Sequence, residues 1–212
     1  MKPTFLAVIV STMLASVAFG QVRVGKLGIG LRGDAYMFQA DHKSTKNTPG
    51  GGLDVNYSLW ENIGIRMAVG GGSLQSKNTN TGLRHTTSIF YGNFYVSGDF
   101  MPNSSFNPFV FAGGGLFYFD PRWDATGLSS AKGGLLTSFS GGAGVDYFLS
   151  EFISISLSGE YVLSSTDRLD GEKISGTSSD SYQRFSFGIR YYFFDQDFIT
   201  KILKALEERY KK

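Results

Sequence analysis

The sequence predicts an all-β fold: an up-and-down, eight-stranded antiparallel transmembrane β-barrel followed by a short C-terminal amphipathic helix. Three observations predict it. Apolar residues alternate with small or polar residues in eight segments, the connections between the segments alternate between short and long, and the apolar faces carry no charged residue. The composition agrees, because aromatic residues make up 15% of the chain and charged residues only 18%, with 28 glycines.

Residues 1–20 predict a cleaved signal peptide. Lys2 provides the positive start, an apolar run extends from Phe5 to Val17, and Ala18 and Gly20 supply small residues for cleavage before Gln21. The run is shorter than the ~20 residues of a membrane-spanning helix, which argues against a membrane anchor. No long uncharged apolar run follows, so the rest of the chain is either soluble and secreted or crosses a membrane as strands.

The eight alternating segments are each expected to form one strand. A strand that crosses a bilayer at a tilt needs ~9–11 residues. The segments are Leu27–Met37, Leu53–Leu59, Ile63–Gly70, Phe90–Phe100, Phe109–Phe119, Thr137–Leu149, Ile153–Leu163 and Phe185–Phe193. In the fifth segment, the apolar outer face is expected to carry Phe109, Phe111, Phe117 and Phe119.

The connections distinguish the two ends of the predicted barrel. Three are shorter, at 60–62, 101–108 and 150–152, and four are long and polar, at 39–50, 73–86, 121–133 and 164–181. Short periplasmic turns and long extracellular loops produce this rhythm in outer-membrane barrels, whereas a soluble sandwich has no reason to segregate its loops. We therefore expect the barrel to span residues 21–194.

Charged residues gather on the faces opposite the apolar ones. An eight-stranded barrel is just wide enough to be filled by side chains, and buried charges must be paired or hydrated. Five positive and five negative residues therefore predict a self-compensating network in the lumen: Lys26, Arg32, Arg66, Arg184 and Arg190 with Asp34, Asp54, Asp99, Asp146 and Glu160. The alternative, a soluble sheet with one solvated face, leaves the aromatic outer face uncovered.

The composition excludes several classes of function. The 20 Lys and Arg residues nearly balance the 18 Asp and Glu residues, so nucleic acid is not an expected partner. The chain has no Cys and only two His, which excludes thiolate chemistry and argues against a histidine metal site. Gly28, Gly30 and Gly33 match a dinucleotide fingerprint, but the alternation continues where that motif needs a helix, and no cofactor is expected. The tripeptide Arg32-Gly33-Asp34 is interpreted as a charge pair in the lumen rather than as an adhesion motif.

An internal repeat leads to a family resemblance. Residues 51–65 share with residues 141–155 the pattern G-x-x-V-x-Y-x-L-x-E-x-I-x-I. Together with the eight-stranded layout, this pattern resembles the outer membrane protein β-barrel domain family, the OmpA/OmpX-like small barrels. The resemblance covers about residues 22–194. It implies an outer-membrane location in a Gram-negative-type bacterium.

The last strand is similar to the terminal signal of that family, which the barrel assembly machinery recognises. The residues that carry this similarity are Phe185, Phe187, Ile189, Tyr191 and Phe193. Residues 195–212 depart from the pattern, because apolar residues recur there at helical spacing among lysines. They predict an amphipathic helix on the periplasmic side, which is either a tail resting near the barrel mouth or an interfacial or partner-binding helix.

For function, the sequence favours a non-enzymatic outer-membrane barrel with a structural or surface-interaction role. The expected partners are outer-membrane lipid, the assembly machinery and an extracellular ligand that contacts the four long loops. A narrow pore for ions or small solutes is one alternative. A lipid A-modifying enzyme is another, and it would draw on Asp41, His42, Ser44 or His85.

Overall fold

The structure is a computed structural model that describes residues 25–39, 44–77, 84–123, 133–165 and 180–193. Within these ranges, no helix combines the length and the apolar character needed to cross a membrane. The predicted signal peptide (1–20) and the predicted C-terminal helix (195–212) lie outside the described residues.

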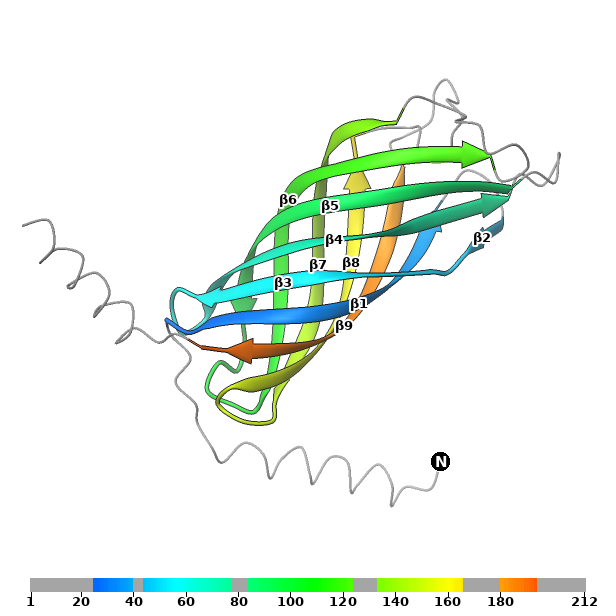
Figure 1. Ribbon diagram of the computed structural model, residues 1–212. Coiled ribbons are helices and arrows are strands. Elements are labelled where there is room, and N and C mark those ends of the chain that lie inside the picture. The colour runs from blue at the N-terminus through cyan, green and yellow to red at the C-terminus, as the bar shows by residue number, and fades with distance from the viewer. Residues whose placement is uncertain (1–24, 40–43, 78–83, 124–132, 166–179, 194–212) are drawn as a thin grey trace, which may run out of the picture.

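The described residues form a single antiparallel sheet that closes on itself (Figure 1). The strands follow the order β4-β3-β1-β9-β8-β7-β6-β5, and a further pairing of β4 with β5 completes the predicted eight-stranded barrel. The strands are β1 (Leu27–Gln39), β2 (Ser44–Lys46), β3 (Thr48–Ser58), β4 (Ile63–Lys77), β5 (Arg84–Asp99), β6 (Phe106–Trp123), β7 (Gly134–Phe148), β8 (Ile153–Ser164) and β9 (Ser181–Tyr192).

The short strand β2 is not a separate strand of the barrel wall. It continues the line of β3, because both pair with β4. Lys46 pairs with Gln75 of β4, whereas Gly50 pairs with Gly72, so the register shifts by one residue between β2 and β3. One extra residue at this break is the mark of a β-bulge, which bends the strand and strengthens its twist. The barrel wall therefore still has eight strands.

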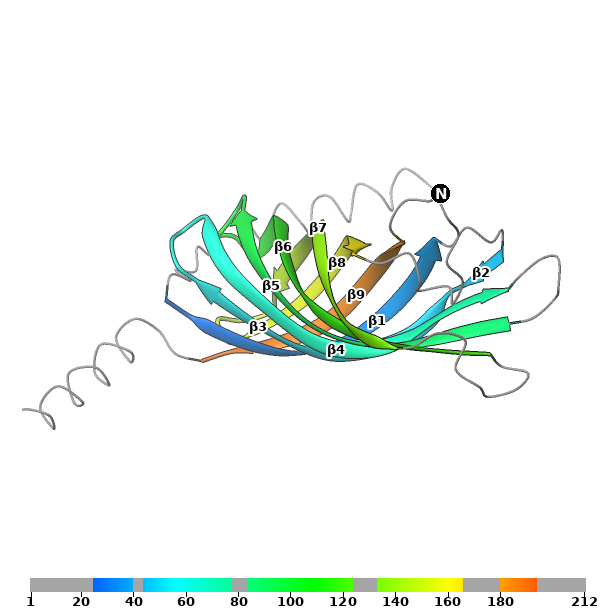
Figure 2. The same ribbon diagram turned by 90° about the horizontal axis from the view of Figure 1, so that it is seen from above.

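The barrel is strongly sheared. Following the paired residues once around the wall from Tyr191 of β9, through β1 and every other barrel strand, leads back to β9 at Ser181, ten residues away. A closed sheet with such a stagger must tilt its strands, typically by ~35–45°. The tilt and the curvature of the strands are visible in Figures 1 and 2.

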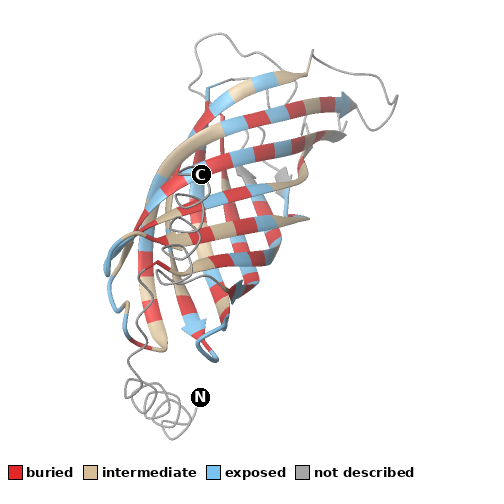
Figure 3. Cartoon of the chain, turned by 60° about the vertical axis from the view of Figure 1, so that its left-hand side comes forward, coloured by how far each residue is buried: buried red, intermediate tan, exposed pale blue. Residues whose placement is uncertain are grey.

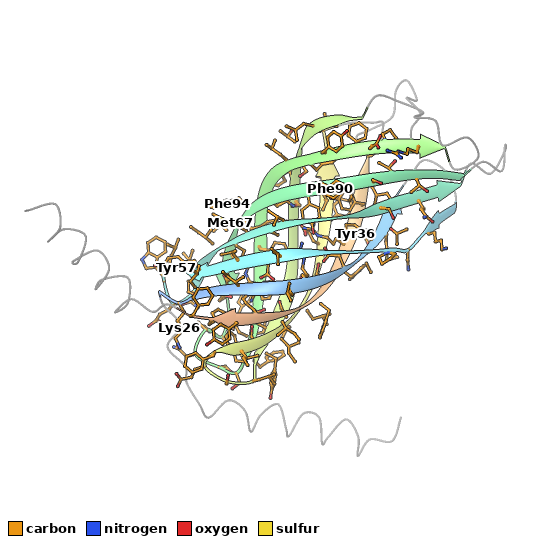
Figure 4. The ribbon with its side chains drawn as sticks, in the orientation of Figure 1. Lys26, Tyr36, Tyr57, Met67, Phe90 and Phe94 are labelled. Carbon is orange, nitrogen blue, oxygen red and sulfur yellow. The ribbon has the colours of Figure 1, made fainter. Side chains whose placement is uncertain are left out.

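Buried and exposed residues alternate along the strands (Figure 3). In β9, Phe185, Phe187 and Ile189 are exposed, whereas Arg184 and Arg190 are buried. Figure 4 shows Met67, Phe90 and Phe94 on the outer surface of the front wall. The outer wall is thus apolar and the buried charged side chains face the lumen, as the alternation predicts for a barrel in lipid.

The predicted faces of the fifth segment are reversed in the structure. Phe109, Phe117 and Phe119 are buried in the lumen, whereas Val110 and Leu116 are exposed on the outside. Both faces of β6 are apolar, so hydrophobicity alone does not distinguish them. Inside the barrel the aromatic side chains pack on side chains from other strands or on one another: Arg66 lies over Phe109, Tyr95 packs on Phe111, and Phe117 lies beside Phe119.

The strands extend to different lengths at the two ends of the barrel. At the short-turn end, the connections are 59–62, 100–105 and 149–152. At the opposite, long-connection end, β4, β5 and β6 continue into segments predicted to be loops and reach further than β1, β8 and β9 (Figure 1). The apolar alternation stops there, because the outward residues become polar, although the backbone pairing continues.

The reversed faces of β6 can be tested directly, because the chain has no Cys. A fluorophore on Leu116→Cys should be quenched by brominated lipid, because Leu116 is 50% exposed on the lipid-facing wall. Phe117→Cys should stay unlabelled in the folded barrel, because Phe117 is only 1% exposed inside it. The opposite result for this adjacent pair would restore the sequence-based assignment.

Candidate functional site

We call the half of the lumen nearer the short turns the lower half, and the half nearer the long connections the upper half. The lower half holds five charged side chains of alternating sign, which we call the five-charge chain: Asp54, Arg190, Asp146, Arg66 and Asp99. Arg190 Nη2 lies 2.6 Å from Asp54 Oδ2, and Arg190 Nη1 lies 3.3 Å from Asp146 Oδ2. Arg66 Nη2 lies 2.9 Å from the same Asp146 oxygen and 3.4 Å from Asp99 Oδ1. The five residues lie on strands β3, β9, β7, β4 and β5, so the chain of contacts crosses the lumen.

Neutral residues complete the five-charge chain. The Asn107 side-chain amide donates to Asp99 Oδ1 at 2.9 Å, and Arg190 Nη1 donates to the Tyr192 hydroxyl at 3.1 Å. The Arg66 guanidinium carbon lies 3.5 Å from the centre of the Phe109 ring. This cation–π contact, typically about 0.5–2 kcal/mol, explains why Phe109 of β6 faces the lumen.

Closer to the long-connection end, Glu160 and Arg184 form a fully buried ion pair. Arg184 Nε donates to Glu160 Oε2 at 2.9 Å, and Arg184 Nη2 contacts the same oxygen. The Tyr95 hydroxyl accepts from Arg184 Nη2 at 2.9 Å and donates to Glu160 Oε1 at 2.8 Å. The Arg184 guanidinium also lies over the Tyr91 ring, 4.1 Å from its centre.

The carboxylate of Asp34 is the other buried centre in this half. Arg32 Nε lies 2.9 Å from Asp34 Oδ1, and the Ser186 hydroxyl donates to the same oxygen at 2.7 Å. The hydroxyls of Tyr91 and Tyr36 donate to Asp34 Oδ2 at 2.8 and 3.2 Å. Side chains from β1, β5 and β9 therefore converge on one carboxylate.

These contacts are what allow the charges to be buried at all. Taking an ion out of water costs several kcal/mol, and only close partners with further hydrogen bonds offset that cost. Arg184 is completely buried and Asp146 is 1% exposed, so neither is solvated by bulk water. Removing one member therefore leaves an uncompensated buried charge on its partners.

The structure places nine of the ten predicted network residues in the lumen contacts described above. The exception is Lys26, which precedes β1 at the short-turn end, the same end as Tyr57 (Figure 4). Its ammonium group lies 4.0 Å from the exposed carboxylate of Glu151. Lys26 therefore belongs to the rim of the barrel, because β1 begins only at Leu27.

The residues of the predicted assembly signal lie in and just after β9. Phe185, Phe187, Ile189 and Tyr191 point outward and are exposed. Tyr191 stacks on Phe152, with ring centres 6.2 Å apart, and on Phe193 at 6.0 Å. Of the residues considered for enzyme chemistry, Asp41 and His42 lie outside the described residues, and position 85 lies in β5, paired with Trp123.

Tyrosines in the lumen take part in the charge network, which the sequence pattern of charged residues did not predict. Tyr36, Tyr91, Tyr95 and Tyr182 are all buried and belong to one cluster, and three of them hydrogen-bond to the charged groups. The signal was available for Tyr36, Tyr91 and Tyr95, because each occupies an inward position of a predicted alternating segment, whereas Tyr182 precedes the last predicted segment. A buried Tyr needs a partner for its hydroxyl, and the lumen carboxylates supply one.

Inward glycines make room for these large side chains. A methyl group added to Gly50 or Gly72 would overlap with the Tyr36 ring. One added to Gly70 would lie 2.6 Å from the Tyr91 hydroxyl, closer than any normal contact. The glycine-rich runs of β3 and β4 are therefore positions over which lumen side chains lie.

The described residues leave little free space between the charged groups of the lumen. A cavity of about 40 Å³ lies between the two halves, lined in part by Arg32, Arg66, Arg190, Glu160 and Tyr95. One water needs ~10–15 Å³ of such space, so the cavity has room for only a few waters. Beyond it, towards the long-connection end, the lumen is filled by an apolar and aromatic cluster: Tyr36, Ala68, Leu74, Ile89, Tyr91, Tyr95, Phe117, Phe119, Val162 and Tyr182.

A closed eight-stranded barrel with an apolar wall and a charge-paired lumen defines a small outer-membrane barrel protein. The model of the outer membrane protein beta-barrel domain family matches residues 4–193. The chain therefore belongs to this family and is an outer-membrane protein, which confirms the resemblance. No curated protein sequence matches the chain significantly.

Solved structures show the same fold. The chain is similar to OprG from Pseudomonas aeruginosa, with 16% identity and a TM-score of 0.55 over 82% of this chain and 99% of that one. It is similar to Neisserial surface protein A, with 13% identity and a TM-score of 0.55 over 80% and 99%. It is also similar to Ail, the attachment invasion locus protein of Yersinia pestis, with 16% identity and a TM-score of 0.53 over 80% and 99%.

Replacing one partner of the buried Arg184–Glu160 pair should destabilise the barrel strongly. Replacing both partners should cost less than the sum of the two single changes. Arg184→Met or Glu160→Gln alone should lower the free energy of unfolding by about 3–5 kcal/mol, since each leaves a buried charge unpaired. The double variant should lose clearly less than the sum. Urea unfolding in lipid vesicles, followed by tryptophan fluorescence, measures this. Arg122→Gln is the control, because the Arg122–Asp120 pair is exposed and should change stability by less than about 1 kcal/mol. If the losses of unfolding free energy in the two single variants simply added in the double variant, Arg184 and Glu160 would not stabilise each other as described.

The glycine packing gives a second prediction. Gly72→Ala should destabilise the barrel by about 1–3 kcal/mol, because the new methyl group collides with Tyr36. Adding Tyr36→Leu should relieve part of that loss. Gly33→Ala is the matched control, since its Cβ would meet nothing closer than the Phe187 carbonyl oxygen at 3.9 Å. The same unfolding assay applies, and equal losses at both glycines would refute the explanation.

Proposed function

We propose that the protein is a non-enzymatic barrel with a structural or surface-interaction role, exerted through its four long connections on the extracellular side. The filled lumen supports this proposal. The five-charge chain crosses the lower half of the lumen, and the apolar and aromatic cluster fills the upper half. A solute would have to break several buried ion pairs to pass, and the cavity between the halves holds only a few waters.

An extracellular ligand for the long connections is part of the proposal. Surface barrels present their variable loops on a rigid wall, and loops of this kind commonly carry binding functions. Ail has the same fold, and its structure was solved in complex with the heparin analogue sucrose octasulfate. A barrel of this architecture can therefore hold a ligand, and we propose the same general capacity for this chain.

The proposed biogenesis follows from the two ends of the chain. We infer export by a signal peptide cleaved before Gln21, and recognition of the β9 residues by the barrel assembly machinery. The outward aromatic and aliphatic row of β9 supports this recognition, because it leaves the side chains of that strand accessible. Residues 195–212 are proposed to remain in the periplasm as an amphipathic helix.

Conductance in planar lipid bilayers tests the central proposal. The full folded protein should give no sustained channel openings, whereas the pore alternative requires reproducible ohmic steps. Tyr36→Ala combined with Tyr182→Ala serves as the comparison, because it removes two large side chains of the cluster that fills the lumen. Stable openings by the unmodified protein would overturn the proposal in favour of the pore.

The enzyme alternative is tested in bacterial cells that express the protein. Mass spectra of lipid A should be identical with and without expression of the protein. Loss or gain of an acyl chain, abolished by replacing His42 or His85, would instead establish a lipid A-modifying activity.

A further inference from the structure

The cavity between the two halves of the lumen is lined by charged groups of both signs, with cations in excess. Three guanidinium groups, from Arg32, Arg66 and Arg190, line it against two carboxylates, from Asp54 and Glu160. These residues belong to five different strands, β1, β4, β9, β3 and β8. Only the closure of the barrel brings them around one space.

The two carboxylates of the lining already accept hydrogen bonds from other groups. Asp54 Oδ2 accepts from Arg190 Nε at 2.7 Å. Glu160 Oε1 accepts from the Tyr95 hydroxyl at 2.8 Å, and Glu160 Oε2 accepts from Arg184 Nε at 2.9 Å. Each acid beside the cavity therefore has bonded partners of its own.

Two cationic donors of the lining, Arg66 Nε and Arg32 Nε, have no hydrogen-bond acceptor among the described residues. The Arg66 side chain is only 9% exposed, one face of its guanidinium lies on the Phe109 ring, and its Nη2 contacts Asp146. Arg32 Nε lies 2.9 Å from an oxygen of Asp34 but forms no hydrogen bond in that direction. A buried donor without an acceptor is costly, so this lining favours an occupant that accepts.

A small anion suits these donors better than water does. Hydrogen bonds between ionised partners are roughly twice as strong as neutral ones, and the low dielectric of an interior strengthens them further. An anion only accepts, whereas a water molecule must also find acceptors for its own hydrogens. The cavity of about 40 Å³ has room for only a few waters, so a halide ion fits and a large organic anion does not.

The charge balance of the whole lumen does not oppose an anion at this place. The described lumen network has five carboxylates and four guanidiniums. The acid at the end of the five-charge chain, Asp99, does not line the cavity. It accepts from Asn107 and borders a smaller space together with Glu61 and Pro102 of the short turns. The groups nearest the cavity dominate its potential, and among these the guanidiniums are in excess.

We propose that this cavity binds one small monovalent anion, such as chloride, between the Nε–H groups of Arg66 and Arg32. The ion links the five-charge chain of the lower half to the Arg32–Asp34 contact of the upper half, and it thereby stabilises the folded barrel. The site needs neither a conducting lumen nor a ligand on the long connections. It is therefore independent of the proposed surface role.

Thermal unfolding of the full folded protein in detergent micelles tests the site. The midpoint is followed while chloride replaces gluconate at constant ionic strength, so that screening stays the same. Chloride and bromide should raise the midpoint in a saturable manner, because an ion that binds only the folded state stabilises it. A midpoint that does not change with chloride would overturn the proposal.

Two alanine variants separate the cavity from the outer wall. Ala68 lines the cavity and is 3% exposed, so Ala68→Leu adds bulk there without removing a polar partner. Ala112→Leu adds the same bulk on the exposed outer face of β6. The chloride-dependent rise should be lost in Ala68→Leu and kept in Ala112→Leu. An equal response of both variants would show that chloride acts elsewhere.

Crystals of the unaltered protein grown in bromide give a reading that needs no variant. Anomalous scattering should place one bromide ion within hydrogen-bond reach of Arg66 Nε. Density without an anomalous signal at that position would identify water as the occupant and refute the anion site, even if the Ala68 variant does not fold.

Discussion

Closing eight strands into a barrel leaves an interior that side chains must fill, and most of the other features follow from this limit. Charged side chains that point inward cannot rely on bulk water, so they are paired with groups on other strands. Asp146 meets arginines from β4 and β9, and Asp34 receives hydroxyls from β1, β5 and β9. Inward glycines then become necessary, because rings such as that of Tyr36 lie over the neighbouring strands β3 and β4 and need room there.

The same limit explains how much of the molecule could be predicted from its sequence. The alternation fixed the faces of β1, β7 and β9, because there the inward residues are polar or small and the outward ones apolar. It also placed nine of the ten predicted charges inside. In β6 both faces are apolar, and the choice depends on partners from distant strands: Arg66 over Phe109, and Tyr95 against Phe111 at 5.1 Å between ring centres. No local pattern contains that information.

Partner choice within the lumen was equally out of reach. Arg66 and Asp146 are 80 residues apart, and they meet only because the ring of strands closes with a particular stagger. A different shear would align the same ten residues differently. Strand ends were also misjudged, since β4, β5 and β6 continue to pair after leaving the apolar layer, where polar outward residues imitate a loop.

A filled lumen also decides where the protein can interact with anything else. The interior is occupied by its own ion pairs and rings, and the wall is covered by lipid, so the polar surfaces at the two ends remain. The short-turn end is compact, whereas the opposite end extends β4, β5 and β6 beyond the apolar layer. An extended sheet holds its side chains at fixed spacing, which a flexible loop does not. The residues that project there are therefore positioned by the same closure that forces the lumen charges to pair.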